Sequence, residues 1–209
     1  MDFVTPRANT PSSTAAESDG PFLVIGLGNP GPAYAATRHN IGAMVCDELA
    51  DEASPMPASF SVHKRTNCDV AEARIDNRRV VLAKPRSYMN VSGGPVAALC
   101  KYFKVAPSSP IVVHDEIDID FGAVRLKRGG GEGGHNGLRS ISQALGTKDY
   151  IRVRAGVGRP PGRMDVADFV LKPFAKHEQD GLPVLVADAA DAVRLLLDRG
   201  LEAAQNAVH

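Results

Sequence analysis

The sequence has no excess of charge of either sign, few cysteines and no long hydrophobic run. Its 24 Lys and Arg residues balance 24 Asp and Glu residues, so no overall field attracts polyanions, and binding to nucleic acid requires a local basic patch. The three cysteines, Cys46, Cys68 and Cys100, are odd in number and lack metal-site spacing, which indicates buried thiols in a reducing, cytoplasmic compartment. Because no apolar run approaches the length of a bilayer span, we expect no membrane association.

Several signatures of catalysis are missing as well. No Ser or Cys stands in a nucleophile elbow, and no group of His, Cys and Asp residues has zinc-site spacing. The sequence therefore predicts no metal and favours water as the attacking group of any hydrolysis. The Walker pattern and the paired metal-binding carboxylates of small-nucleotide hydrolases are also absent, which argues against a nucleotide hydrolase or binder built on the glycine loops.

Length and composition indicate one substantial α/β domain, or two small domains at most. The chain has 209 residues, of which 44% are hydrophobic and 23% are charged, as in ordinary globular proteins. Residues 1–20 are rich in Ser, Thr, Ala and Pro and contain no apolar segment. We therefore expect a flexible tail there, rather than a secretory signal or a transit peptide, and a folded domain over residues 21–209.

Apolar runs that alternate with helical patterns predict the fold. Two runs joined at Asp76-Asn77 indicate a hairpin, and the other strands are separated by helices. We expect an α/β fold with a mixed, mostly parallel, twisted sheet and helices on both faces. The predicted strands are Phe22–Ile25, Asn67–Ile75, Arg78–Ala83, Ile111–Val113, Ala123–Lys127 and Tyr150–Arg154. The predicted helices are Ile41–Asp51, Val96–Phe103, Leu138–Leu145, a short turn at Asp165–Leu171 and a long helix from Ala175 to about Asn206 that Gly181-Leu-Pro183 disturbs.

The chain is organised around residues 26–40, which follow the first strand. Glycines and prolines make a stiff loop that presents Asn29 at the C-terminal end of the strand, where open α/β sheets bind ligands. His39 and Asn40 come directly before the next helix. The spacing Gly-x-Gly-x-x-Gly also occurs in dinucleotide-binding folds, but here a proline follows the third glycine and no acidic residue stands about twenty positions on to bind a ribose.

Polar residues recur where other predicted strands end: Asn90, Asp115 and the pair His135-Asn136. Each of them alone is at least as well explained by a structural role in a turn. Together they place one carboxylate and several amides on one rim of the sheet. A His39 base oriented by Asp115, with neutral amides to hold a carbonyl or donate to an oxyanion, suits the hydrolysis of an activated acyl compound.

Basic residues gather on two of the predicted strands, where they recur at one parity. They could form a local phosphate-binding patch beside the predicted site. A solvated sheet edge explains the same charges equally well. These residues are Arg125, Lys127, Arg152 and Arg154, with Arg128 adjacent.

Several longer motifs occur in order, without large gaps, from about Phe22 to the C-terminal helix. They are Gly26-Leu-Gly-Asn-Pro-Gly31 with Tyr34, Thr37-Arg-His-Asn-Ile-Gly42, Lys84-Pro with Tyr88-Met-Asn90 and Ser92-Gly93, Val113-His-Asp-Glu116, and Gly129-Gly-Gly131 through Gly133-Gly-His-Asn-Gly137. This set closely resembles the motifs of bacterial-type peptidyl-tRNA hydrolases. Several independent motifs in register are far more specific than any one of them.

The resemblance implies that residues 21–209 form a monomeric α/β enzyme of the cytoplasm. Such an enzyme cleaves the ester between the C-terminus of a peptide and the 3′-terminal ribose of tRNA, and so recycles prematurely released peptidyl-tRNA. It works without metal or cofactor and has no obligate protein partner. The expected partner is therefore the nucleic-acid substrate, peptidyl-tRNA.

The resemblance also assigns catalytic roles, which are expectations for this chain. His39 would be the general base that acts on water, and Asp115 the carboxylate that orients it. Asn29 and Asn90 would position the substrate and the reacting groups. Asn136 would hold the peptide side or help to place the water.

Further residues would shape the cleft and bind the tRNA. Tyr34 and Met89 would line the cleft, and His135 would support the loop that carries Asn136. Lys127 and Arg154 would clamp the terminal phosphate of the tRNA. The segment Gly156–Leu171 would act as a lid.

Two departures from the family pattern are visible. Ser87 replaces a threonine with little expected effect, and Glu132 adds a negative charge to the glycine loop that could weaken phosphate contacts.

The rival interpretation is an RNA-binding protein on the same fold that has lost hydrolysis, as the chloroplast intron-splicing relatives of the family suggest. The presence of His39, Asp115 and the three asparagines favours an active enzyme.

Overall fold

Strand β1, Phe22–Gly26, is the first apolar run of the sequence and takes the middle position of a seven-stranded sheet with the order β2-β3-β4-β1-β5-β7-β6. The computed structural model describes residues 20–209, so the predicted tail lies outside the described residues except for Gly20. The other strands are β2 Ser61–His63, β3 Cys68–Ile75, β4 Arg78–Pro85, β5 Ile111–Glu116, β6 Val124–Arg128 and β7 Ile151–Gly156. The helices are η1 Arg38–Asn40, α1 Ile41–Asp51, η2 Met89–Val91, α2 Gly93–Phe103, α3 Asn136–Leu145, α4 Val166–Val170 and α5 Leu182–Val208.

The four strands β4, β1, β5 and β7 are parallel neighbours, and β2, β3 and β6 complete the sheet by antiparallel pairing. The predicted mixed sheet is confirmed. Because the carboxyl ends of parallel strands meet at one rim, the segments that follow β1 and β4 and the end of β5 come together there. This rim carries Asn29, Asn90 and Asp115. The expectation that His135 and Asn136 lie at the rim because β6 ends there is wrong, since β6 is antiparallel and ends at the opposite rim, and the glycine loop brings these two residues back to the cavity.

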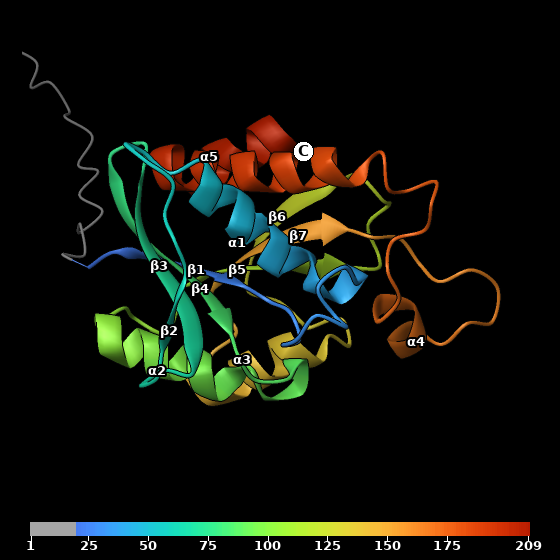
Figure 1. Cartoon of the computed structure of the whole chain (residues 1–209), viewed down its shortest axis with the longest axis horizontal. Helices are drawn as coiled ribbons and strands as arrows, with labels where there is room; N and C mark the ends of the chain where they lie inside the picture. Colours follow the sequence, from blue (N-terminus) through green and yellow to red (C-terminus); the bar gives the residue numbers. More distant parts are fainter. Residues whose placement is uncertain (1–19) are drawn as a thin grey trace, which may run out of the picture.

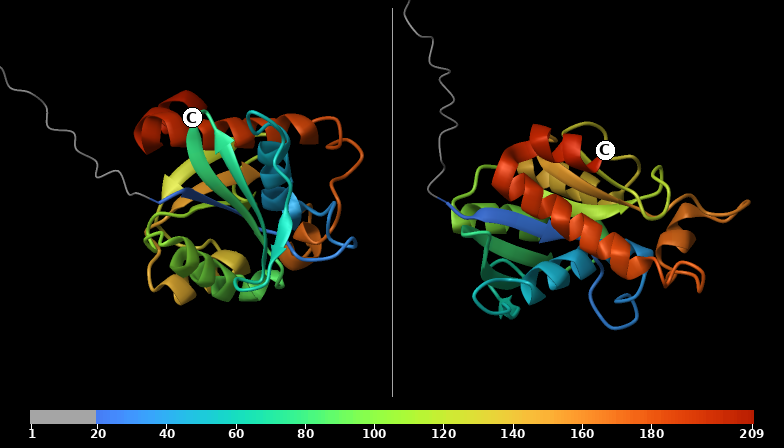
Figure 2. Two further views of the ribbon diagram at one scale, coloured as in Figure 1. Left: turned by 60° about the vertical axis from the view of Figure 1, so that its left-hand side comes forward. Right: turned by 90° about the horizontal axis from the view of Figure 1, so that it is seen from above.

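Helices cover both faces of the sheet (Figure 1 and Figure 2). Helices α1 and α5 pack on the face that includes Val24 of β1, and α2 and α3 pack on the opposite face with Leu23 and Ile25. Successive strand residues point to opposite faces, so β1 is buried on both sides, which explains its uninterrupted apolar run. The short helix α4 stands apart from these layers at one end of the sheet (Figure 1).

Helix α1 lies unusually close to the sheet because two glycines have no side chain at the contact. A Cβ on Gly42 would lie 2.2 Å from the carbonyl oxygen of Val113, and a Cβ on Gly26 would lie 2.3 Å from the carbonyl oxygen of Gly42. No larger residue fits at these distances. The close contact holds the start of α1 against the ends of β1 and β5, and so positions His39, three residues before Gly42.

The C-terminal helix differs from its predicted bounds. It begins at Leu182, not at Ala175, because residues 175–181 form a separate turn in which the Glu178 amide donates to the Ala175 carbonyl. Pro183 lies in the first turn of α5, where a missing N–H breaks no helical hydrogen bond. Gly200, with φ 78° and ψ 178°, interrupts the helix further along.

Two strands also differ from the prediction. Strand β5 continues to Glu116, so Asp115 lies inside the strand rather than after it. Strand β2 was not predicted, because it has only three residues and is largely exposed, and therefore shows no apolar alternation.

The three cysteines are free and buried, as the sequence indicates. Burial raises the pKa of Cys46 and Cys68 to about 12 and that of Cys100 to about 11, so all three are protonated at neutral pH. Within residues 20–209, no helix combines the length and the apolar character that crossing a bilayer requires.

Candidate active site

His39 and Asp115 lie side by side although 76 positions separate them in the sequence. The Nδ1 atom of His39 is 2.9 Å from each carboxylate oxygen of Asp115, and Asp115 is only 2% exposed. Since an ionised carboxylate only accepts hydrogen bonds, Nδ1 carries the hydrogen and Nε2 is left as an acceptor. This Nε2 has no hydrogen-bond partner within residues 20–209, and His39 lines a cavity.

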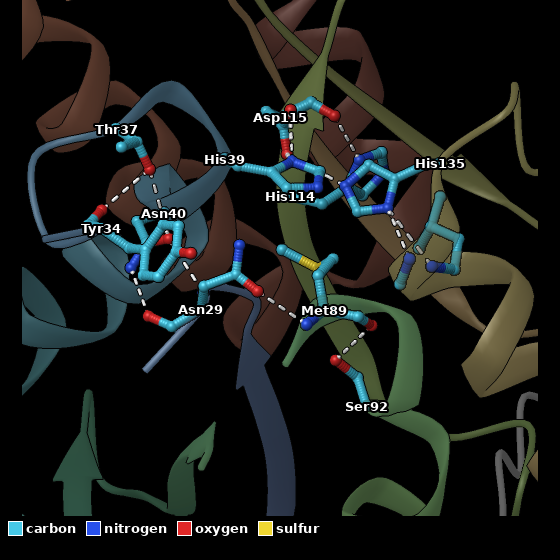
Figure 3. A network of polar contacts seen from close by, with 12 residues as sticks. Asn29, Tyr34, Thr37, His39, Asn40, Met89, Ser92, His114, Asp115 and His135 are labelled. Carbon is cyan, nitrogen blue, oxygen red and sulfur yellow. Dashed lines mark hydrogen bonds and ion pairs between the residues drawn. The ribbon is translucent and has the colours of Figure 1, made fainter. Parts of the chain in front are cut away.

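His135 donates a second hydrogen bond to Asp115, from Nε2 to Oδ1 at 2.9 Å. Its other nitrogen, Nδ1, caps helix α3 by accepting from the amides of Gly137 at 3.1 Å and Leu138 at 3.3 Å. Two amide donors at Nδ1 require the hydrogen of the neutral ring to be on Nε2. Figure 3 shows Asp115 above the neighbouring rings of His39 and His135, whose centroids are 4.8 Å apart.

These contacts decide the charge of the carboxylate. Burial alone would raise the pKa of Asp115, but the charges and hydrogen bonds of His39 and His135 outweigh it and hold the pKa below its ordinary value. Asp115 is therefore ionised at neutral pH, and it stabilises the positive charge that His39 gains when it accepts a proton.

A third histidine, His114, lies beneath this pair and is 1% exposed. Its Nδ1 donates to the main-chain carbonyl of Asp115 at 2.7 Å, and its Nε2 has no partner within the described residues. Burial lowers the pKa of His114 to about 3. The ring is therefore neutral and packs against His135, with ring centroids 5.0 Å apart.

Asn29 joins the loop after β1 to the segment after β4. Its side-chain oxygen accepts a hydrogen bond from the Met89 amide at 2.7 Å, which leaves its side-chain NH₂ free to donate. Asn40 in turn holds the main chain of Asn29 (Figure 3). Asn40 thus holds the main chain of Asn29, and the Met89 amide holds its side chain.

A cavity of about 670 Å³ opens in front of His39. Segments that are distant in the sequence form its walls: the loop after β1, η2, the glycine loop before α3, and α4 on the opposite side. The structure places Tyr34, Met89, Asn90, His135 and Asn136 on these walls, together with Tyr88, Glu116, Val166 and Leu171. Lys127 and Arg154 do not line the cavity.

The basic strands β6 and β7 do not form the broad patch that the sequence suggests. Their register places Lys127 opposite Arg152, but Arg152 is 2% exposed. It donates to the carbonyl oxygens of Gly130 at 3.0 Å and Gly131 at 2.6 Å. Including Arg152 in a phosphate patch was therefore wrong, because this buried guanidinium holds the glycine loop.

The other cations on this surface differ in how far their charge is paired. Arg154 is bound by Glu116 at 3.0 Å, and Arg128 lies 3.8 Å from Asp149. Lys127 is exposed and has no ion-pair partner within residues 20–209. Of the two predicted clamp residues, only Lys127 has a charge that no carboxylate of the described chain neutralises.

The unexpected Glu132 of the glycine loop is also paired. Its carboxylate accepts a hydrogen bond from Lys148 at 3.2 Å. Burial alone would raise the pKa of Glu132, but the hydrogen bond from Lys148 lowers it. The added negative charge is thus compensated locally.

His39, Asp115 and His135 also form a set that could hold a cation, with candidate ligand atoms within 4.8 Å of one another. The same atoms are joined to each other by the hydrogen bonds described above. A divalent ion there would displace both hydrogen bonds.

Asn40, which the sequence places directly after His39, lies close to Asn29 as expected. Two residues of the site were missed by reasoning from the sequence, because Tyr88 was noticed only as part of a motif and Glu116 had no role. The partners of Tyr88 and Glu116, Tyr34 at a ring separation of 6.3 Å and Arg154, are 54 and 38 positions away, so no local pattern reveals them.

Comparison with known proteins gives a consistent result. The family model described as peptidyl-tRNA hydrolase matches residues 23–209. A peptidyl-tRNA hydrolase of Nocardia farcinica is 64% identical over 192 residues, which cover 92% of this chain and 98% of the relative. The enzyme of Mycobacteroides abscessus is 61% identical over 92% of this chain and 96% of its own length.

Solved structures agree with the sequence relatives. The crystal structure of peptidyl-tRNA hydrolase from Acinetobacter baumannii superposes with a TM-score of 0.83 at 34% identity, and the match covers 90% of this chain and 94% of that one. Fold, site geometry and sequence identity therefore lead to one conclusion: the chain belongs to the peptidyl-tRNA hydrolase family.

Proposed function

We propose that His39 is the general base with which this peptidyl-tRNA hydrolase directs water at the ester between peptide and tRNA. The observation that carries the proposal is the 2.9 Å contact between His39 Nδ1 and the ionised Asp115. It leaves Nε2, on the cavity side, as the only basic nitrogen of the ring.

The reaction then follows in two proton transfers. Water attacks the ester carbonyl carbon while His39 Nε2 takes its proton, and Asp115 stabilises the imidazolium. The same nitrogen returns the proton to the ribose oxygen as the ester bond breaks. The free NH₂ of Asn29 is positioned to donate to the oxyanion of the tetrahedral intermediate.

The cavity supports a role in binding the peptide. Tyr34, Met89, Val166 and Leu171 supply apolar walls, which accept side chains of many kinds. The amides of Asn90 and Asn136 face the same space and are suited to main-chain groups, which every peptide has. This division fits an enzyme that must accept any peptide sequence.

We expect the glycine loop and β6 to bind the tRNA part of the substrate. Lys127 is the cation that we expect to bind the terminal phosphate, since no carboxylate within residues 20–209 neutralises it. Arg154 contributes less than Lys127, because Glu116 already holds its guanidinium.

We also propose that the enzyme works as a monomer in the cytoplasm. The three buried, unpaired thiols support a reducing compartment. The cavity is assembled from segments of a single chain, so the site needs no second subunit.

Release of free tRNA from N-acetyl-aminoacyl-tRNA tests the base. Purified enzyme should turn over with EDTA present, and the His39→Ala variant should retain substrate binding but lose turnover. Turnover by the variant equal to the natural enzyme would remove His39 from the mechanism. Binding without turnover by the natural enzyme would favour the rival RNA-binding interpretation.

A further inference from the structure

Arg38, the residue before His39, is 4% exposed although it is charged. Its side chain is directed to the segment that follows the lid helix α4. Nη1 donates to the carbonyl oxygens of Phe169 at 3.3 Å, Lys172 at 3.3 Å and Pro173 at 2.9 Å. One guanidinium group thus binds three carbonyl oxygens within residues 169–173, at the C-terminal end of α4 and just after it.

A buried carboxylate completes this contact. Glu178 is 7% exposed and accepts from Arg38 Nη2 at 2.6 Å. It also accepts from the Ala175 amide at 2.6 Å, so its position is fixed by its own turn. Because a charge-assisted hydrogen bond between two buried groups has a defined geometry, it sets the distance between residue 38 and residues 169–178.

The main chain makes the same connection. The Arg38 amide donates to the Lys172 carbonyl at 3.2 Å, and Thr37 forms an isolated bridge with Pro173. The guanidinium carbon lies 4.1 Å from the centre of the Phe169 ring. The turn that carries the base and the end of the lid are therefore one connected structure.

Helix α4 depends on such an anchor. It has five residues, which is too short for a helix to be stable in isolation. A second cavity of about 480 Å³ lies near this contact, lined by residues that include Arg38, Met164, Phe169 and Glu178. The lid is therefore incompletely packed there, and its attachment rests on Arg38 and the buried side chains of Phe169 and Val170.

We propose that Arg38 is a positioning residue that, together with Glu178, holds α4 in place as a wall of the peptide-binding cavity. The inference rests on the proposed function, in which Val166 and Leu171 contact the peptide. Since His39 is held independently by Asp115, loss of Arg38 should weaken substrate binding more than the chemical step.

Steady-state kinetics with N-acetyl-aminoacyl-tRNA separate these effects. In Arg38→Gln we expect KM to rise by about fivefold to tenfold and kcat to change by less than about twofold. Glu178→Gln removes only the ion pair and leaves the contacts of Arg38 with the three carbonyls, so its KM should rise less, and the double variant should be no worse than Arg38→Gln, which already lacks both sets of contacts. Arg38→Lys keeps a positive charge beside Glu178 but not the guanidinium geometry that reaches the carbonyls, so its KM should lie between those of the natural enzyme and Arg38→Gln.

Hydrogen exchange gives a readout independent of turnover. Amides of residues 165–173 should exchange at least about tenfold faster in Arg38→Gln, while those of β1 remain protected. Arg194→Gln, which removes the ion pair to Glu52 away from the cavity, is the matched control and should alter neither KM nor exchange.

Two results would overturn the inference. One is an unchanged KM in the folded Arg38→Lys and Glu178→Gln variants, which also decide the case should Arg38→Gln fail to fold. The other is a fall in kcat at constant KM, which would show that Arg38 positions His39 and not α4. Failure of the proposed function itself is distinct, because the natural enzyme and Arg194→Gln would then be inactive too.

Discussion

The side chain of Asn40 holds both main-chain polar groups of Asn29: its Oδ1 accepts from the Asn29 amide at 2.9 Å, and its Nδ2 donates to the Asn29 carbonyl at 2.9 Å. This pairing fixes the backbone of a loop rich in glycine and proline. It also directs the Asn29 side chain to the Met89 amide, 2.7 Å away. Asn40 therefore positions a residue of the site from outside the cavity.

Replacing Asn40 should impair the enzyme through Asn29. We expect Asn40→Ala to lower kcat/KM by between about tenfold and a hundredfold, because a displacement of the Asn29 amide misplaces a reacting group. The double variant Asn29→Ala, Asn40→Ala should be no worse than Asn29→Ala alone. Additive losses in this double-mutant cycle would show that Asn40 acts separately.

Asp115→Asn should abolish most of the turnover while the fold is kept. An amide offers its NH₂ group where His39 and His135 both donate, so the hydrogen of His39 moves to Nε2, the atom that must accept a proton. We expect kcat to fall by about 10³-fold to 10⁴-fold with little change in KM. Single-turnover rates at saturating enzyme check this, and a loss below about tenfold would contradict it.

Two substitutions of His135 separate its structural and electrostatic roles. His135→Ala removes both the cap of α3 and the donor to Asp115, whereas Asn is a good cap but too short to replace the imidazole donor. We expect His135→Ala to lose about 1 kcal/mol of stability and His135→Asn much less. Both should lower kcat similarly. If His135→Asn had full activity, the bond to Asp115 would have no catalytic role.

Lys127→Ala should raise the KM for peptidyl-tRNA and reduce its dependence on salt. Loss of one phosphate contact lowers the slope of log KM against log salt concentration by about 0.7 to 0.9. Arg128→Ala removes a neighbouring exposed cation whose charge is paired with Asp149, and serves as the control. An equal change of slope in both variants would point to general attraction and not to a specific clamp.

The burial of neutral His114 should make the protein sensitive to mild acid. Its folded-state pKa of about 3 lies below the ordinary value of 6.5, so the unfolded chain binds the extra proton first. The stability from this group is complete above the ordinary pKa and declines as pH falls toward the folded value, by about 2 kcal/mol at about pH 5. Urea unfolding near neutrality and near pH 5 should show a smaller loss of unfolding free energy in His114→Asn than in the natural protein. Equal losses in the two proteins would exclude this histidine as the cause.

Much of the fold follows from local sequence patterns. The apolar run of β1, the turn residues Asp76 and Asn77 with φ of 47° and 65°, and the start of α1 at Ile41 depend on neighbouring residues, so their prediction succeeded. The start of α5 was misplaced because a turn over residues 175–181 has a helical composition. Gly181 and Pro183 mark the boundary in the sequence, and the buried contact of Glu178 with Arg38 holds the turn apart from the helix that follows.

Local patterns were enough to predict the main strands and helices in their order along the chain, the family, and the chemical groups of the site. This is because propensity, periodicity and motif spacing are local properties of the chain. The availability of each charge, in contrast, follows from the three-dimensional arrangement. Arg152 and Arg154 look alike in the sequence, yet one is buried against glycine carbonyls and the other is bound to Glu116. Electrostatic pairing depends on distances of a few ångströms between residues far apart in the chain, and folding alone sets those distances.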